Sequence, residues 1–363
     1  MHHELYMSRC LELAEKGLGT TYPNPLVGSV IVHENKIIGE GWHQRAGGPH
    51  AEVRAINSVE DRHLLAASTL YVNLEPCSHF GKTPPCADLI LEHKIPRVVV
   101  GCLDPNAKVS GRGIRRLRDH GVEVIEGVLM QECQALNRRF FSIHQKRRPY
   151  VILKWAQSED AYLFPDVKQG ETQGPVWISN LHSRQLVHQW RTEEASILVG
   201  RKTVEQDDPS LTPRDFVGEN LLRLVLDPNK NLSSEYKLFK DQNETVVLVD
   251  RAKVEKETSV LGHHEMGANH EVGVNHEVDL NFDGQPLNEL MDYLFKAQVH
   301  SLIVEGGATT LNSFIEAGLW DEARVFHGKV AFHGGVKAPD LRQDPIKVES
   351  IGSDRLYWYR KES

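Results

Sequence analysis

The sequence predicts two α/β domains in series. Segments with strand and helix character alternate along most of the chain, which favours sheets that contain parallel strands covered by helices. A length of 363 residues corresponds to two domains at roughly 150 residues each. Apolar residues make up 40% of the chain, enough to build two separate hydrophobic cores.

The first half is expected to hold a helix and a hairpin, followed by alternating helices and strands. Apolar spacing and turn residues predict helices at 5–16, from about 50, at 85–93 and at 111–120. Strands are predicted at 27–32, 36–39, 69–74, 97–102 and 122–125. One long helix is expected at 130–145, and the basic run Lys146-Arg147-Arg148-Pro149 that ends it also suits a helix C-terminus. We place the domain boundary in this run, which gives domains 1–147 and 148–363.

The second half repeats the alternation. Strands are expected at 150–155, 196–199, 222–226, 245–249 and 301–304, and helices at about 183–191, 286–297 and 309–317. Three hexads rich in His and Glu begin at His264, His270 and His276. Metal binding is one interpretation, but their polar composition favours an inert surface loop.

Charge and composition argue against several classes of function. The net charge of −8 disfavours a protein that binds nucleic acid by neutralising phosphates. No apolar run approaches the ~20 residues that cross a bilayer, and the first residues do not have the pattern of a signal peptide. Five scattered cysteines are too few for a disulfide framework. We therefore expect a cytoplasmic enzyme of small molecules, without a nucleic-acid or membrane partner.

A catalytic zinc site is predicted in the first domain. His50, Cys77 and Cys86 supply three ligands, which leaves the fourth tetrahedral position open for water, as in catalytic zinc sites. Glu52 follows two residues after His50, and in zinc deaminases such a glutamate moves protons without binding Zn²⁺. A closed structural site, with a fourth ligand from another cysteine or His79, is the alternative. It would leave Glu52 without a role.

These motifs resemble the bifunctional deaminase–reductases of riboflavin biosynthesis, and the resemblance covers nearly the whole chain. Its most specific part is Leu74-Glu-Pro-Cys-Ser-His-Phe-Gly-Lys-Thr-Pro-Pro-Cys86. The resemblance implies a cytidine-deaminase-like α/β/α domain that hydrolytically deaminates a diaminopyrimidinone carrying a phosphoribosylamino group. The residues implied to hold this substrate are Asn24, His43, Lys82, Asp104 and Asn106.

The second domain has no Gly-x-Gly-x-x-Gly after a strand, which disfavours a Rossmann domain. The resemblance instead implies a dihydrofolate-reductase-like α/β domain that uses NADPH to convert the ribosyl group into a ribityl chain. The residues implied to contact the cofactor are Ala156, Gln157, Trp177, Thr203, Asp207, Gly307, Ala308, Thr309, Thr310, Leu311, Asn312 and Ser313. Those implied to contact the reductase substrate are Lys154, Arg191, Leu211, Arg214 and Glu305, with Lys154 and Asp207 as candidates for proton transfer.

One stretch departs from the family, which usually reads Ser-Leu-Asp-Gly where this chain reads Ser158-Glu-Asp-Ala161. If position 161 needs a positive φ, alanine costs about 1 kcal/mol there or sends the loop along another path. A deaminase whose second half binds without turnover is therefore one alternative. A nucleic-acid deaminase is another, although the acidic charge and residues 82–86 argue against it. The resemblance also implies a homodimer formed through the second half.

Overall fold

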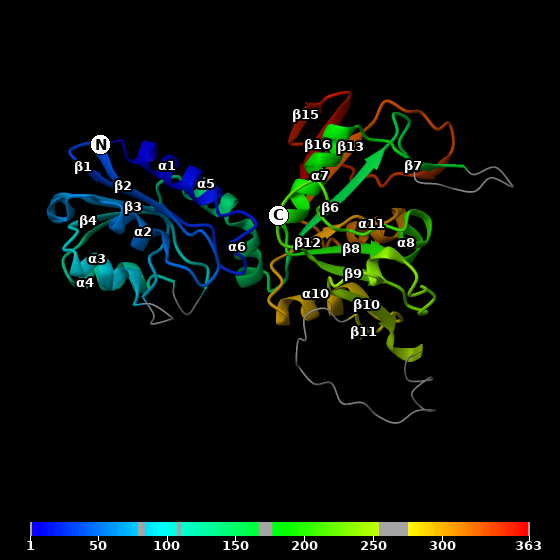
Figure 1. Cartoon of the computed structure of the whole chain (residues 1–363), viewed down its shortest axis with the longest axis horizontal. Helices are drawn as coiled ribbons and strands as arrows, with labels where there is room; N and C mark the ends of the chain where they lie inside the picture. Colours follow the sequence, from blue (N-terminus) through cyan, green and yellow to red (C-terminus); the bar gives the residue numbers. More distant parts are fainter. Residues whose placement is uncertain (1, 79–83, 107–109, 167–175, 254–274, 362–363) are drawn as a thin grey trace. The chain divides into compact units, whose positions relative to one another are not determined.

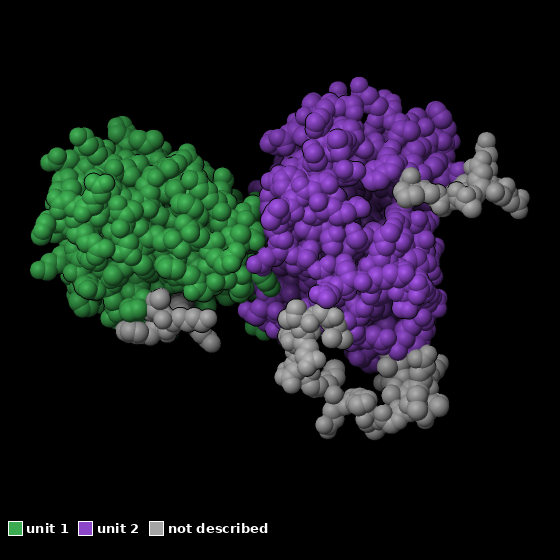
Figure 2. Space-filling model, viewed as in Figure 1, with its two compact units in different colours: residues 1–147 green, residues 148–363 purple. Residues whose placement is uncertain are grey.

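The computed structural model describes residues 2–78, 84–106, 110–166, 176–253 and 275–361 (Figure 1). Lys82, the hexad that begins at His264 and residues 270–274 of the next hexad lie outside the described residues. The chain divides into two compact units, residues 1–147 and 148–363, which Figure 2 colours separately. Each unit has hydrophobic clusters of its own, so each is described by itself.

The first unit contains a five-stranded sheet in the order β2-β1-β3-β4-β5. The β1–β2 hairpin and the β1–β3 pair are antiparallel, whereas β3, β4 and β5 run parallel. The strands are β1 (Gly28–His33), β2 (Lys36–Trp42), β3 (Thr69–Leu74), β4 (Arg97–Cys102) and β5 (Glu123–Glu126). The helices are α1 (His3–Glu15), α2 (Ala51–Asn57), the 3₁₀ helix η1 (Arg62–Ala67), α3 (Cys86–Glu92), α4 (Arg112–Asp119), α5 (Met130–Leu136) and α6 (Arg138–Gln145).

Helices cover both faces of this sheet, because successive side chains of each strand point to opposite faces. Ile56, Ile90 and Leu117 bring α2, α3 and α4 into one apolar cluster. Met7 and Cys133 bring α1 and α5 into the cluster on the other face. The predicted α/β/α arrangement is confirmed.

The single helix expected at 130–145 is wrong, because the chain forms two helices separated at Asn137. The buried Asn137 side chain accepts a hydrogen bond from Leu26 N (2.8 Å) and donates one to Leu26 O (2.9 Å). The Asn137 side chain thus satisfies the backbone N–H and carbonyl of Leu26, and the helix is interrupted at this residue.

The second unit contains a nine-stranded sheet in the order β11-β10-β9-β8-β12-β6-β13-β16-β15. Strands from β11 to β13 in this order are parallel, and β16 and β15 add antiparallel pairs at one edge. The strands are β6 (Tyr150–Gln157), β8 (Ser196–Gly200), β9 (Leu222–Leu226), β10 (Thr245–Asp250), β11 (His276–Leu280), β12 (Ser301–Val304), β13 (Glu322–His327), β15 (Lys347–Ile351) and β16 (Asp354–Arg360). A separate two-stranded sheet pairs β7 (Tyr162–Pro165) with β14 (Gly335–Lys337).

Helices pack on both faces of the large sheet as well. These are α7 (Leu181–Glu193), α8 (Arg201–Asp207), the 3₁₀ helix η2 (Lys237–Phe239), α10 (Pro286–Lys296) and α11 (Ala308–Glu316). One apolar cluster holds Leu294 of α10 and Phe314 of α11, and the other holds Val187 of α7 and Val204 of α8. Within the described ranges, no helix is both long and apolar enough to cross a membrane.

The hexad that begins at His276 was expected in a surface loop, and this expectation is wrong. Residues 276–280 form β11, the edge strand that pairs in parallel with β10. Val278 and Leu280 alternate inward onto the core. Their alternation is a strand pattern.

The departing stretch after β6 forms the turn into β7. Ala161 has a φ of +64°, so alanine occupies the left-handed conformation that glycine would adopt without strain. The Ser158 hydroxyl donates to Asp160 (2.7 Å) and accepts from the backbone N–H of Tyr162 (2.9 Å). The sequence left two outcomes open for position 161, a strained alanine with positive φ or a different path of the loop. The structure has the positive φ.

Ala161→Gly is expected to raise the unfolding free energy of the second unit by about 1 kcal/mol, since it removes this strain. Denaturant unfolding followed by tryptophan fluorescence measures the change. Ala317→Gly is the control, because Ala317, the C-cap of α11, has a φ of −71°, where glycine relieves no strain and should not stabilise. Equal destabilisation by both substitutions would contradict the assignment of strain.

Candidate functional site

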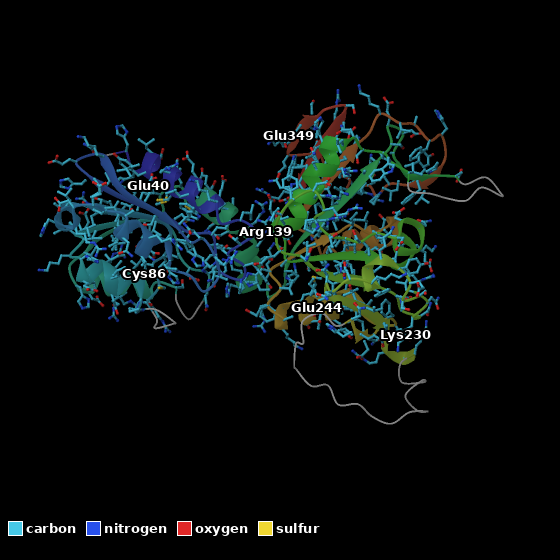
Figure 3. The ribbon with its side chains drawn as sticks, viewed as in Figure 1. Glu40, Cys86, Arg139, Lys230, Glu244 and Glu349 are labelled. Carbon is cyan, nitrogen blue, oxygen red and sulfur yellow. The ribbon has the colours of Figure 1, made fainter. Side chains whose placement is uncertain are left out.

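Three metal-binding side chains meet in the first unit. His50 caps the N-terminus of α2, Cys86 is the first residue of α3, and Cys77 lies shortly after β3. Their ligand atoms all lie within 4.8 Å of one another. His50 Nδ1 is 3.3 Å from Cys86 Sγ and 3.5 Å from Cys77 Sγ. Figure 3 labels Cys86 at the start of α3.

The spacing and charge of these donors fit zinc. Zinc bonds of about 2.0–2.3 Å place tetrahedral ligands roughly 3.3–3.8 Å apart, close to the distances observed. Hydrogen bonds from the Cys86 thiol and from His50 lower the pKa of Cys77 to about 4, so Cys77 favours the thiolate that binds metal. Burial, with the Cys77 charge nearby, raises the pKa of Glu52 to about 7. Glu52 is therefore suited to accept and return a proton.

Asn24 and His43 lie next to the His50 ligand. The His43 and His50 rings meet edge to face, with 5.7 Å between their centroids. His43 Nδ1 is 3.1 Å from the Pro49 carbonyl, so Nδ1 carries the proton and donates it. His43 Nε2 then accepts from Asn24 Nδ2 at 3.0 Å. Burial lowers the pKa of His43, which keeps this arrangement neutral.

Asp104 and Asn106 follow β4, and a residue that sequence reasoning missed holds their segment. The buried Glu75 carboxylate accepts the N–H of Asp104 (3.3 Å), and Asp104 Oδ1 accepts the N–H of Asn106 (2.8 Å). Glu75 also accepts the N–H groups of Gly111 and Gly113, both at 2.9 Å, at the start of α4. Its position two residues before Cys77, at the end of a buried strand, was the available signal.

Most residues predicted for the reductase line one cavity of about 500 Å³ in the second unit. They are Lys154, Ala156, Trp177, Arg191, Thr203, Asp207, Leu211, Arg214, Glu305 and Gly307. They come from the end of β6, from α7 and α8, from the turn after β12, and from the segments beside these elements. In open α/β sheets, ligands bind at the carboxyl ends of the parallel strands.

A buried ion cluster lies in this cavity. Glu305 accepts from Arg191 Nη2 at 2.9 Å and from Arg191 Nε at 3.2 Å, and it lies 3.5 Å from Lys154 Nζ. Burial raises the pKa of Glu305, but the charges of Arg191 and Lys154 outweigh burial and hold it at about 2. Burial lowers the pKa of Lys154. Glu305 thus orients two cations along the cavity wall.

A second cavity, of about 1110 Å³, adjoins the first, because Thr203 and Gly307 line both. It also receives four further residues predicted for the cofactor, namely Ala308, Thr309, Thr310 and Ser313. A Cβ at Gly306 would lie 2.6 Å from the Thr310 side chain, so the turn before α11 requires glycine. Sequence reasoning missed Arg201, Lys202, Leu226 and Pro228, which also line this cavity. Arg201 and Lys202 follow β8, Leu226 ends β9 and Pro228 lies shortly after it, so their places at the ends of predicted strands were the available signal.

Gln157, Leu311 and Asn312 line neither cavity in the described part of the chain. Gln157 is buried and accepts the indole N–H of Trp155 at 2.8 Å. Leu311 is fully buried in the core, because the helical spacing of α11 turns it with Phe314 towards the sheet. The Leu311 side chain therefore packs in the core, and the cofactor contact expected at Leu311 stays a prediction.

Comparisons with known proteins agree along the whole chain. Two family models match: the RibD C-terminal domain at residues 149–353, and the cytidine and deoxycytidylate deaminase zinc-binding region at residues 1–102. The riboflavin biosynthesis protein RibD of Aquifex aeolicus is 37% identical over 98% of both chains. That of Escherichia coli K12 is 38% identical over 90% of this chain and 87% of its own.

Solved structures are similar over the same extent. One is the diaminohydroxyphosphoribosylaminopyrimidine deaminase/5-amino-6-(5-phosphoribosylamino)uracil reductase of Thermotoga maritima. It has a TM-score of 0.82 at 35% identity and covers 99% of this chain and 98% of its own. RibD of Acinetobacter baumannii gives a TM-score of 0.83 at 29% identity, with 99% of each chain covered.

Glu75→Gln should lower the unfolding free energy of the first unit by about 1–3 kcal/mol, because an amide replaces one acceptor oxygen with a donor facing backbone N–H groups. Thermal unfolding of the zinc-loaded chain measures this loss. Glu60→Gln, on an exposed residue, is the control and should change little. An unchanged unfolding temperature for Glu75→Gln would contradict the conclusion that the Glu75 carboxylate holds the segment after β4 in place.

Proposed function

The chain belongs to the family of the riboflavin biosynthesis protein RibD, and on this premise we propose how its two units divide the work. The protein is a bifunctional enzyme of riboflavin biosynthesis, a hydrolase and an oxidoreductase. We propose that residues 1–147 form the zinc-dependent deaminase and residues 148–363 the reductase.

The first unit, in this proposal, hydrolyses an amino group from 2,5-diamino-6-ribosylamino-4(3H)-pyrimidinone 5′-phosphate. The observation that carries the proposal is the cluster of three zinc ligands beside a buried carboxyl, with Asn24 and His43 adjoining it. The name of the Thermotoga relative supports this choice of substrate. Asn24 can donate to and accept from a base edge, and Lys82 is assigned to the phosphate.

Each group in the first unit then has a defined task. Zinc held by His50, Cys77 and Cys86 would supply the positive charge that activates water for attack on the ring. Glu52 takes a proton from that water and delivers it to the departing amine. Burial raises the pKa of the Glu52 carboxyl, which makes it a stronger base than an exposed glutamate.

In the second unit, we assign the larger cavity to NADPH and the smaller one to the deaminated substrate. Gly307 to Ser313 bring the N-terminus of α11 to the larger cavity, where backbone N–H groups suit a phosphate. NADPH supplies the hydride that converts the ribosyl group into a ribityl chain. Arg191 and Arg214 are assigned to the substrate phosphate, because guanidinium groups bind phosphate through paired hydrogen bonds.

Proton handling in the second unit is assigned to Lys154 and Asp207, which line the smaller cavity. Burial lowers the pKa of Lys154 and raises that of Asp207, so both carry their charges less readily than in water. Leu211 is assigned to the substrate, whereas Ala156 and Trp177, which line the same cavity, are assigned to the cofactor.

The two alternatives are not favoured. Similarity to RibD proteins extends through both units, which argues against a second half that only binds and against a nucleic-acid deaminase. Ala161 also retains the left-handed conformation, so the loop between β6 and β7 need not take another path. Two finer features stay proposals on the resemblance alone: a homodimer through the second unit, measurable by light scattering, and a location in the cytoplasm.

A two-step assay tests the proposed function. Purified, zinc-loaded protein is mixed with the diaminopyrimidinone substrate, and released ammonia and NADPH absorbance are followed in parallel. Ammonia release followed by stoichiometric NADPH loss supports both assignments, whereas NADH in place of NADPH should react more slowly. Ammonia release with constant NADPH absorbance would restore the alternative of a binding-only second half.

Glu52→Gln should lower the deaminase kcat by about 10²–10⁴-fold, because the proton-transfer group is lost. Zinc content, measured by atomic emission, should stay at the wild-type level because Glu52 is not a ligand. Loss of zinc from this variant would contradict the assigned role, and Glu60→Gln is the control.

Arg191→Ala should lower the reductase kcat/KM by about 10- to 100-fold, since it removes charge-assisted hydrogen bonds and leaves Glu305 less well paired. Ammonia release by the same protein should not change. Arg355→Ala, on an exposed residue of β16, is the matched control. Equal losses in both activities would contradict the division between the two units.

A further inference from the structure

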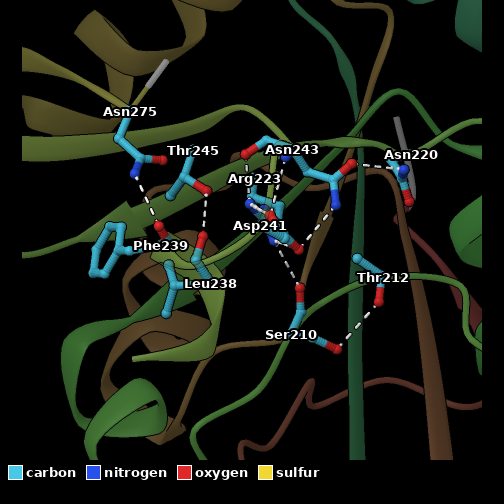
Figure 4. Close-up of polar contacts among 10 residues, drawn as sticks. All are labelled: Ser210, Thr212, Asn220, Arg223, Leu238, Phe239, Asp241, Asn243, Thr245 and Asn275. Carbon is cyan, nitrogen blue, oxygen red and sulfur yellow. Dashed lines mark hydrogen bonds and ion pairs between the residues drawn. The ribbon is translucent and has the colours of Figure 1, made fainter. Parts of the chain in front are cut away.

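A buried cation on β9 has no part in the chemistry described above. Arg223 is only 1% exposed. Its guanidinium donates to both carboxylate oxygens of Asp241, at 2.9 and 2.6 Å, and to the backbone carbonyl of Asn243 at 2.5 Å. A further bond, of 3.1 Å, goes to the backbone carbonyl of Ser210 (Figure 4). Arg223 does not line either cavity of the second unit.

The bond to Ser210 matters because the segment that contains it forms one wall of the smaller cavity. Asp208, Pro209, Ser210, Leu211 and Arg214 all line that cavity, and none of these five lines the larger one. The segment thus shapes the space assigned to the deaminated substrate and takes no part in the wall of the larger cavity, which is assigned to NADPH.

The segment is held on both sides of a strained residue. Leu211 has a φ of +57°, which costs a residue with a side chain roughly 1–2 kcal/mol. Arg223 binds the carbonyl before Leu211, and Arg191 Nη1 approaches the carbonyl of Thr212, after it, at 3.5 Å. The hydroxyls of Ser210 and Thr212 lie 3.1 Å apart and join the two sides. Such strain persists only where the surroundings hold the backbone in place.

Stability by itself does not account for this cation. Its Nε atom has no hydrogen-bond partner among the residues that the structure describes. Well-packed apolar replacements of buried ion pairs are often neutral or stabilising. The Arg223 guanidinium lacks one hydrogen-bond partner but binds the carbonyl of Ser210 in the cavity wall. Its burial is therefore better explained by its effect on the position of that wall.

We propose that Arg223 is a positioning residue for the reductase substrate. By holding Ser210, it keeps Leu211 and Arg214 at the wall of the smaller cavity, although it does not itself touch the substrate. This inference rests on the proposed reductase function. It goes beyond that function because it predicts different effects on the two ligands. If this wall is no longer held, substrate binding should weaken and NADPH binding should stay the same.

Arg223→Met tests the proposal, because methionine is apolar, unbranched and unable to bind Ser210 or Asp241. We expect the KM for the deaminated substrate to rise about 10-fold, while the KM for NADPH changes less than about twofold. Arg223→Lys, which keeps one charge and can reach a single carbonyl, should recover part of the loss. Arg355→Met is the control: Arg355 is an exposed residue of β16 that lines neither cavity, so both KM values should stay unchanged.

Two further measurements test the positioning role if Arg223→Met does not fold or if the wild-type chain consumes no NADPH. If Arg223→Met does not fold, Asp241→Asn replaces it, because the loss of one bonded oxygen should raise the substrate KM in the same direction by a smaller factor. If the wild-type chain consumes no NADPH, that result by itself refutes the proposed function. The positioning role is still tested in that case, because calorimetry measures the dissociation constant of the deaminated substrate for the wild-type chain and for the variant. An unchanged dissociation constant, or equal rises in both KM values, would overturn the positioning role.

Discussion

A charge removed from water has to be paired, and this requirement holds the functional side chains of both units in place. In the first unit, the Glu75 carboxylate receives backbone N–H groups from the segment after β4 and from the start of α4. In the second, Glu305 lies between Arg191 and Lys154. Each buried carboxylate satisfies groups from elements far apart in the chain, so the pairing also determines where those elements lie.

The parallel strands determine where this pairing takes place. Cys77 follows the end of β3 and Asp104 the end of β4, and these strands are neighbours in the first sheet. In the second sheet, β12 lies between β6 and β8, so Lys154, Glu305 and the residues after β8 reach the same edge. Both units therefore build a site from short loops on a rigid sheet, which suits precise placement of polar groups.

Two of the residues with a strained backbone lie in loops beside the cavities of the second unit. Ala161 and Leu211 both have positive φ, and hydrogen bonds hold the backbone on either side of each residue. At Ala161, the Ser158 hydroxyl and the neighbouring backbone close a tight turn. At Leu211, distant arginines hold the adjacent carbonyls. A backbone that is held in this way can tolerate alanine or leucine where glycine would cost less.

The amino-acid sequence was enough to predict the α/β architecture, most of the parallel strands, and the residues His50, Cys77 and Cys86 that the fold brings together. Periodicity reports burial within one element, and ligand chemistry depends on residue type, so both are readable locally. Only the tertiary structure decided that Asn137 interrupts a helix, that His276 begins an edge strand, and that Leu311 packs in the core. It alone assigned partners to Glu75 and Arg223. Hydrogen bonds between segments many residues apart depend on which loops the sheets bring together, and no local pattern records that.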